Sequence, residues 1–323
     1  MTDTPAPPPG FFANKPRSVR WAALVFLSFV FAFAIDSAGL PAAALIGPMM
    51  AGIVLGTSGA GLRVPRLAFD GAQAIVGCLI AASIEPVILL AFIDDWPISL
   101  SVAVLTVAAS SILGYLISRW RILPGTTGVW GSAPGAASAM VLMAGAFGAD
   151  QRLVAFMQYL RVLMVSVAAA LVAGIWVDTG SVEAPAHPWF PPIEWLPFAT
   201  TMAVAAIAVV AARVTRLPSM NFLASMVVGI LVHLGLGLSF QLPQWLLAAS
   251  YVAIGWTIGL NFDRAIVAHA FRALPKLVVS ILLLMAFCAG LGWLLHRMLG
   301  VDPLTTYLAT SPGGMDSIAI IAA

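Results

Sequence analysis

Hydroxyl side chains, glycine and proline gather in two segments of otherwise apolar sequence. Residues 125–148 read GTTGVWGSAPGAASAMVLMAGAFG, and residues 305–323 read TTYLATSPGGMDSIAIIAA. Proline and glycine break a helix and free backbone groups that lipid cannot satisfy, so each segment must be buried in protein or line a watered cavity. Half-helix N-termini add partial positive charge and can bind a small polar or anionic solute there, although small residues also serve helix packing alone. The candidate substrate-binding residues are Thr126, Thr127, Ser132, Pro134, Gly135, Ser138, Thr305, Thr306, Ser311, Pro312, Gly313 and Ser317.

Two carboxyl groups are candidates for ion coupling, because an ionisable side chain deep in a membrane is costly and is by default a functional candidate. Asp316 stands in the second segment where Ser138 stands in the first, and it either binds a proton or a sodium ion or caps a half-helix. Glu85 lies near the end of an apolar run and either couples an ion or faces the outer water.

Gln158 and Arg161 form the remaining candidate, a membrane-embedded polar pair. They are three residues apart and therefore share one face of a helix. Arg161 could bind an anionic substrate, pair with Glu85 or belong to a purely structural ion pair.

The residue types that bind metals show no ligand spacing. Cys78 and Cys288 lie in apolar stretches, and the four histidines are far apart. Neither a disulfide framework nor a ligand cluster follows, so we expect no metal site, no cofactor and no catalytic residue.

The elements that must position these side chains are apolar helices. Of the 323 residues, 61% are hydrophobic and 9% are charged, against about 25% charged in soluble domains. This composition predicts an all-α polytopic membrane protein with apolar segments at 21–37, 41–57, 68–93, 97–118, 125–148, 152–177, 196–212, 217–237, 243–261, 274–295 and 303–323. A net charge of +2 is too small for nucleic-acid binding.

The sequence is internally duplicated. Residues 40–53 align with residues 217–230, and at nearly the same offset the Pro-Gly pair of the first broken segment meets that of the second. We therefore divide the chain into a disordered tail (1–20), a first membrane repeat (21–177), a loop (178–194) and a second, incomplete repeat (195–323). The second repeat stops where the first has reached about Gly145, so a final helix is expected to be missing, either because the chain is truncated, which we favour, or because the helix was lost or is supplied by another chain.

The positive-inside rule decides the orientation of the two repeats. If residues 125–148 enter the membrane and return to the same side, all Lys and Arg residues in the loops except Arg297 lie on the cytoplasmic side. If they cross, the charges divide almost evenly. The first arrangement places the N-terminus in the cytoplasm and the acidic loop outside, and it gives inverted repeats, as in secondary transporters. Charge counting does not identify which segment fails to cross.

The duplicated segments resemble a known family. The stretches LPGTTGVWGSAPGAASAMVLMAGAFGADQRLVAFMQYLRVL and DPLTTYLATSPGGMDSIAIIAA resemble the AbrB-duplication membrane proteins of Gram-negative bacteria. The resemblance implies a multi-pass protein of the bacterial inner membrane whose second half continues past Ala323 with another Gln/Arg-bearing helix. Some members are described as regulators of gene expression. Others carry an ammonia monooxygenase label, which implies copper ligands that the scattered histidines do not provide.

These observations favour an ion-coupled secondary transporter of a small polar or anionic solute that binds between the two broken segments. The alternative is a membrane-bound sensor or regulator that acts through a protein partner, and an enzyme is the least favoured class. The expected partners are a small-molecule or ion substrate and the lipid bilayer, with a homo-oligomer left open and no nucleic acid.

Overall fold

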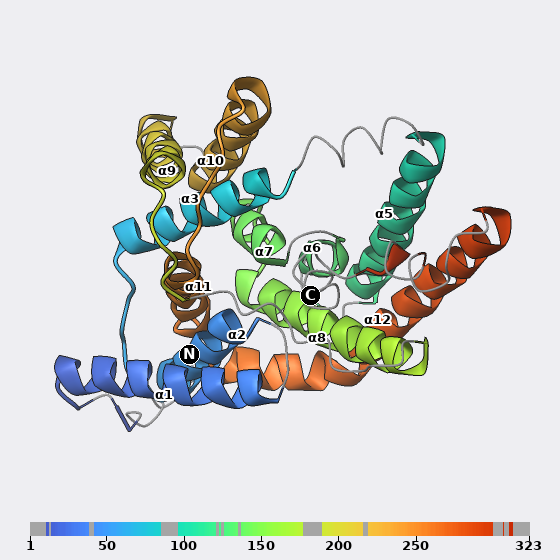
Figure 1. Cartoon of the computed structure of the whole chain (residues 1–323). Coiled ribbons are helices and arrows are strands. Elements are labelled where there is room, and N and C mark those ends of the chain that lie inside the picture. The colour runs from blue at the N-terminus through green and yellow to red at the C-terminus, as the bar shows by residue number, and fades with distance from the viewer. Residues whose placement is uncertain are drawn as a thin grey trace.

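Every regular element that the computed structural model describes is a helix, and the described part contains no strand (Figure 1). This confirms the all-helical fold. The structure describes residues 11–12, 14–38, 42–84, 96–120, 123, 126–134, 137–176, 189–215, 219–299, 306 and 310–312. The helices are α1 (Arg17–Ser37), α2 (Ala43–Thr57), α3 (Arg66–Ala82), α5 (Trp96–Arg119), α6 (Thr127–Ser132), α7 (Ala137–Ala146), α8 (Gln151–Trp176), α9 (Trp195–Thr215), α10 (Met220–Ile230) with its π-helical extension η1 (Leu231–Gly235), α11 (Gln244–Gly259) and α12 (Arg264–Leu299).

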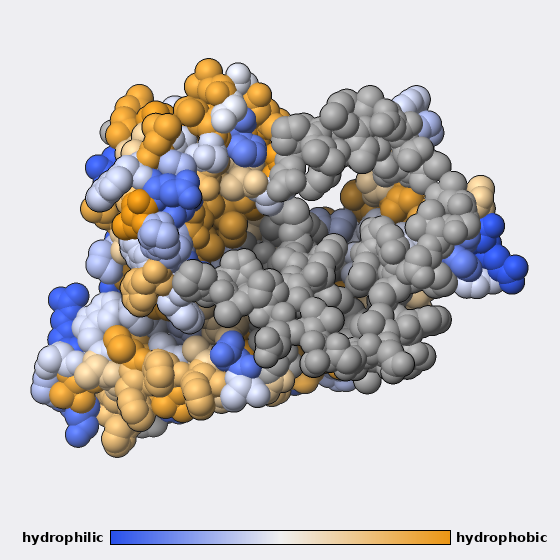
Figure 2. All heavy atoms as spheres, viewed as in Figure 1, coloured by the Kyte–Doolittle hydropathy of each residue, from blue (hydrophilic) through white to orange (hydrophobic). Residues whose placement is uncertain are grey.

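Four of the described helices, α1, α5, α9 and α12, are long and apolar enough to cross a membrane. Large apolar side chains on them face outward, among them Phe26, Phe29 and Phe33 of α1 and Val214 of α9. Hydrophobic residues accordingly gather on the surface over α1 and over α9 and α10 (Figure 2). Such surfaces mark contact with lipid or protein, and together with the helix lengths they indicate a membrane protein.

Other expected spans form shorter helices than their apolar runs suggest. α2, α3 and α11 have 15, 17 and 16 residues, which is less than the roughly 20 residues that cross a bilayer core. Pro65 and Pro243 stand at the N-caps of α3 and α11, where a missing N–H costs nothing. α12 instead begins well before the expected start, at Arg264, because the Asp263 side chain accepts a hydrogen bond from the backbone N–H of Ile266 (2.8 Å) and caps it.

The backbone repeats itself between the two halves. α9 begins and ends 178 residues after α1, and α10 begins 177 residues after α2, so both offsets agree with that of the sequence repeat to within one residue. Ala42 (φ 58°) and Ser219 (φ 54°) occupy the same left-handed position before α2 and α10. The positive-φ residues Gly59 and Gly237 are likewise paired by the repeat. The duplication seen in the sequence is therefore also a duplication of helix bounds and turns.

The helices pack in two groups, each of which draws on both halves of the chain (Figure 1). In the six-helix group (α1, α2, α3, α9, α10 and α11), α2 packs on α11 and α3 packs on α10. In the broken-helix group (α5, α6, α7, α8 and α12), α6 packs against α5 and α8, and α12 packs against α5 and α8. The two halves therefore interlock, and a single core cluster contains residues from both groups.

Glycine permits the close crossings in the six-helix group. A Cβ on Gly77 of α3 would lie 2.6 Å from the carbonyl oxygen of Phe222 in α10, and a Cβ on Gly255 of α11 would lie 2.6 Å from that of Leu45 in α2. The sequence repeat pairs Gly77 with Gly255 and Leu45 with Phe222. The two crossings are thus equivalent, and both require a residue without a side chain.

Candidate functional site

The first broken segment is interrupted between α6 and α7. α6 ends at Ser132, Ala133 adopts an extended conformation (ψ 129°) and Pro134 follows. Proline has no N–H, so the carbonyl of Trp130, four residues earlier, loses its helical donor. The carbonyls of Ser132 and Ala133 are also released from the helical pattern. The break therefore presents a cluster of backbone acceptors in the interior of the protein.

Gln158 and Arg161 of α8 satisfy these acceptors. Gln158 Nε2 donates to the carbonyls of Trp130 (2.8 Å) and Ala133 (3.1 Å), while Arg161 Nη1 donates to those of Ala133 (2.8 Å) and Ser132 (3.3 Å). Both side chains are buried, with exposed fractions of 0% and 1%. The two residues share one helix face, as their spacing requires, and together they hold the broken segment against α8.

Part of this pair's hydrogen-bonding capacity is unused. Arg161 Nε and Nη2 and Gln158 Oε1 are buried without a hydrogen-bond partner among the described residues. Among those residues, Arg152 forms ion pairs with Asp150 and Asp263, and neither pair includes Arg161. A buried guanidinium is energetically costly unless a carboxylate pairs with it, and Arg161 has no such partner within the described ranges. It is also a ready donor for an anion, because its planar fork of N–H groups matches a carboxylate.

Arg161 lines a small cavity at the centre of the broken-helix group. The cavity measures about 10 Å³, and Ser132, Ser280, Leu113, Ile117 and Leu284 contribute to its wall. This volume suits about one water molecule. Ser280, Ile281 and Leu284 are the residues of α12 on this wall. The charge thus lies between the first broken segment and α12.

The hydroxyls of the first segment hold it in place. Ser132 Oγ donates to the carbonyl of Ser110 in α5 (2.9 Å), and Thr127 Oγ1 accepts a hydrogen bond from the backbone N–H of Asp150 (3.1 Å). Thr126 is exposed at the N-cap of α6, and Pro134 is half-buried. Among these candidates, therefore, Thr127 and Ser132 already have protein partners.

The described part of the second segment repeats this anchor. Thr310 Oγ1 donates to the carbonyl of Cys288 (2.9 Å), just as Ser132 Oγ donates to that of Ser110. The sequence repeat pairs donor with donor and acceptor with acceptor. Sequence reasoning missed Thr310, although its equivalence to Ser132 in the repeat points to it. Thr306 and Pro312 are buried and Ser311 is half-buried.

The remaining predicted site residues are not placed. Glu85, Gly135, Thr305, Gly313, Asp316 and Ser317 lie outside the described residues, as does the side chain of Ser138. Both expected ion-coupling carboxyls belong to this set. The described part of the site therefore consists of the Gln158 and Arg161 pair, the first break, Thr306 and residues 310–312 with the Thr310 anchor.

A second polar cluster, which the sequence did not reveal, fixes the start of α8. Asp150 accepts hydrogen bonds from the backbone N–H and the guanidinium of Arg152, each at 3.0 Å. Burial raises the pKa of the Asp150 carboxyl, but the hydrogen bonds and charge of Arg152 and the N–H of Leu153 outweigh it, so the pKa lies below its ordinary value of 3.8. Arg152 also donates to the carbonyl of Asn261 (2.7 Å) and lies 3.7 Å from Asp263. This cluster ties α8 to the turn before α12.

Comparison with known sequences places these features in a family. The profile of the family described as "Transition state regulatory protein AbrB" matches residues 44–323. The chain belongs to the AbrB family. Because the match runs from α2 to the end of the sequence, it includes both broken segments and the Gln158 and Arg161 pair.

Two relatives of this AbrB family member are informative. The chain is 45% identical over 306 residues to "Putative regulator AbrB" of Escherichia coli (strain K12), and the alignment covers 94% of this chain and 88% of that protein. It is 25% identical over 264 residues to "Uncharacterized protein YhjN" of Bacillus subtilis (strain 168), covering 76% of this chain and 68% of that protein. No solved structure matches.

Proposed function

We propose that this AbrB family protein is an ion-coupled secondary transporter of a small polar or anionic solute. The observation that carries the proposal is the fully buried Arg161, which meets a helix break and whose Nε and Nη2 nitrogens have no hydrogen-bond partner among the described residues. Ionisable groups within membrane helices mark substrate and ion pathways. Broken helices whose backbone lines a cavity are the usual place for such sites.

The repeated backbone supports the transporter interpretation. Equivalent helix bounds, left-handed caps and glycine crossings in the two halves are what an inverted repeat would produce, with its opposite orientation assigned by the positive-inside rule. In this proposal the protein spans the bacterial inner membrane several times, with a cytoplasmic N-terminus. The six-helix group and the broken-helix group then move relative to one another, which alternates access to Arg161.

Asp316 and Glu85 are the proposed coupling groups. Asp316 follows the described anchor at Thr310 in the second segment, and Glu85 follows shortly after the end of α3. A carboxyl at either place can bind a proton or a sodium ion and link its occupancy to that of the arginine. Replacing both carboxyls by amides should abolish the dependence of uptake on the ion gradient.

Counterflow in proteoliposomes tests the proposal. Vesicles that contain the protein are loaded with carboxylates, amino acids, sugars or nucleosides, and uptake of the labelled solute is measured with and without sodium and pH gradients. Arg161→Gln should abolish uptake, Arg161→Lys should retain part of it, and Arg66→Gln, at an exposed arginine outside the site, should leave it unchanged. Uptake that survives Arg161→Gln in full, or no uptake of any solute, would contradict the proposal.

A second candidate function is a membrane-bound sensor or regulator, which the regulator descriptions of the family and of the Escherichia coli relative favour. In this case the Arg161 site binds a ligand without transporting it. The basic start of α12, with Arg264 and Arg272 exposed, would then contact a protein partner. Ligand-dependent stabilisation without flux, together with a co-purifying partner lost on Arg272→Glu, distinguishes this function from transport.

A further inference from the structure

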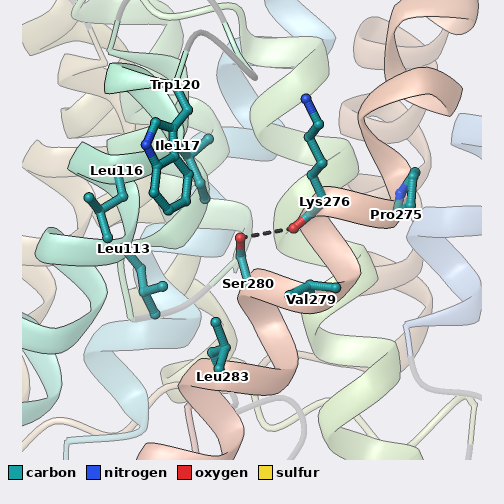
Figure 3. A pocket seen from close by; sticks show the side chains of 9 residues that line it. All are labelled: Leu113, Leu116, Ile117, Trp120, Pro275, Lys276, Val279, Ser280 and Leu283. Atoms are coloured by element: carbon teal, nitrogen blue, oxygen red, sulfur yellow. Dashed lines mark hydrogen bonds between the residues drawn. The ribbon is translucent and has the colours of Figure 1, made fainter.

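A cleft of about 520 Å³ separates α5 from α12 (Figure 3). Its volume lies within the range of small-molecule sites. α5 contributes Leu113, Leu116, Ile117 and Trp120, and α12 contributes Pro275, Lys276, Val279, Ser280 and Leu283. The walls are therefore aliphatic and aromatic, with one cationic and one hydroxyl side chain among them.

The polar groups of the cleft have distinct positions. Figure 3 shows the Lys276 side chain extending toward the end of the cleft where Trp120 lies, with Leu283 at the opposite end. Lys276 is exposed, and no ion pair of Lys276 is found among the described residues. Ser280 lies one turn further along α12 and donates to the Lys276 carbonyl (2.9 Å). An anion approaching along α12 thus meets a lysine first and then Ser280, whose hydroxyl proton is already donated to the Lys276 carbonyl.

The cleft adjoins the cavity that contains Arg161. Leu113, Ile117 and Ser280 line both spaces, so side chains alone separate them. Lys276 and Leu284, at the two ends of the combined path, are about two helical turns and thus about 12 Å apart along the helix. The path therefore runs from a surface cation, between apolar walls, to a buried cation.

We propose that this cleft binds a monocarboxylate with an apolar tail of about four to eight carbons. The proposal rests on the transporter function and names its substrate class. Lys276 attracts the anion, and the carboxylate passes Ser280 and pairs with Nε and Nη2 of Arg161, which have no hydrogen-bond partner among the described residues. The tail stays against Leu116, Val279 and Leu283. A change of rotamer at Leu113 and Ile117 opens the small cavity to the carboxylate. The path of about 12 Å sets the upper limit of the tail length.

Equilibrium binding of labelled acetate, butyrate and hexanoate to the protein in lipid nanodiscs tests the proposal, with empty nanodiscs subtracted. Burial of each methylene should tighten binding by about threefold to fourfold. Hexanol and succinate should bind at least tenfold more weakly than hexanoate, because the first lacks the charge and the second lacks the tail. A series without this dependence on chain length would overturn the proposal.

Substitutions in the cleft locate the site. Leu283→Trp fills the cleft and should weaken hexanoate binding at least tenfold, whereas Leu283→Ala should shift the preference toward longer tails. Leu282→Trp is the matched control, because Leu282 precedes Leu283, is 50% exposed and does not line the cleft. Lys276→Gln should slow association and remove its dependence on salt, while dissociation stays unchanged.

The remaining outcomes separate this proposal from the function on which it rests. Counterflow of succinate or another hydrophilic solute, without hexanoate binding, would refute the monocarboxylate and leave the transporter standing. No counterflow with any solute would refute the transporter. A bound phospholipid that hexanoate does not displace and that Leu283→Trp removes would assign the cleft to a lipid chain and overturn the proposal.

Discussion

The six-helix group and the broken-helix group place backbone polar groups in the membrane in different ways. In the first group the helices continue through their crossings, and glycines such as Gly77 and Gly255 let two backbones approach. In the second group the chain is broken at Ala133 and Pro134, and side chains of α8 replace the lost helical hydrogen bonds. The first arrangement suits a rigid support, and the second brings a charge to the centre of the protein.

Both groups contain features that occur twice, once in each half of the chain. The crossings of the six-helix group occur twice with equivalent residues, and so does the hydroxyl anchor of the broken-helix group, at Ser132 and Thr310. Arg161 of the first half adds a buried charge to this duplicated scaffold. That buried charge is the feature that calls for a function.

The largest effect is expected at Arg161. Arg161→Met should weaken binding of an anionic solute about 100-fold, since it removes a desolvated charge–carboxylate contact. Its free energy of unfolding should change by less than about 2 kcal/mol, because loss of two carbonyl contacts is offset by removal of a costly buried charge. Parallel binding and unfolding measurements check this, and a large loss of stability with intact binding would make Arg161 purely structural.

Substitutions at the glycine crossings should have almost as large an effect, but on the free energy of unfolding alone. Gly77→Ala and Gly255→Ala should each lower the free energy of unfolding by about 2 kcal/mol, because each added methyl overlaps a carbonyl of the facing helix. Gly71→Ala and Gly290→Ala are the controls, since a Cβ there meets nothing within 4 Å. Unequal losses at Gly77 and Gly255 would show that the two crossings are not equivalent.

The hydroxyl anchors should contribute less. Ser132→Ala and Thr310→Val should each destabilise the protein by about 1 kcal/mol, the net value of one hydrogen bond. Thr310→Ser retains the donor and should be close to the unsubstituted protein. Thermal unfolding of the single and double variants measures this, and a loss confined to Ser132→Ala would leave the second segment without its inferred anchor.

The smallest effect concerns pH. The pKa of Asp150 is depressed in the folded protein. The carboxylate therefore adds to the free energy of unfolding above its unfolded pKa near 3.8, and this stabilisation is lost as the pH falls through the folded pKa. Asp150→Asn should therefore cost about 1 kcal/mol or less at pH 7 and nothing at strongly acidic pH. Unfolding measured from pH 7 to about pH 2 tests this, because the range then extends below the unfolded pKa, and a constant difference would place the effect elsewhere.

Local patterns predicted two geometric features of the candidate site. Pro134 predicted the interruption of the first segment, because proline removes a donor wherever it stands, and the three-residue spacing of Gln158 and Arg161 predicted their shared face. The partners of these side chains could not be predicted in the same way. They are carbonyls of a different helix, far from α8 in the chain, so the contact depends on how α6 packs against α8.

The sequence by itself determined the apolar helices, the position of the first break and the duplication, since these depend on composition and on the local chemistry of proline and glycine. Only the tertiary structure decided that the two halves interlock in two groups. It also decided that Arg161 lies beside the break, where Nε and Nη2 find no partner among the described residues, and that the cleft between α5 and α12 adjoins this site. Helix packing brings together residues far apart in the chain, and many apolar faces are compatible with one another in sequence. The close backbone approach at residues such as Gly77 and Gly255 selects among them.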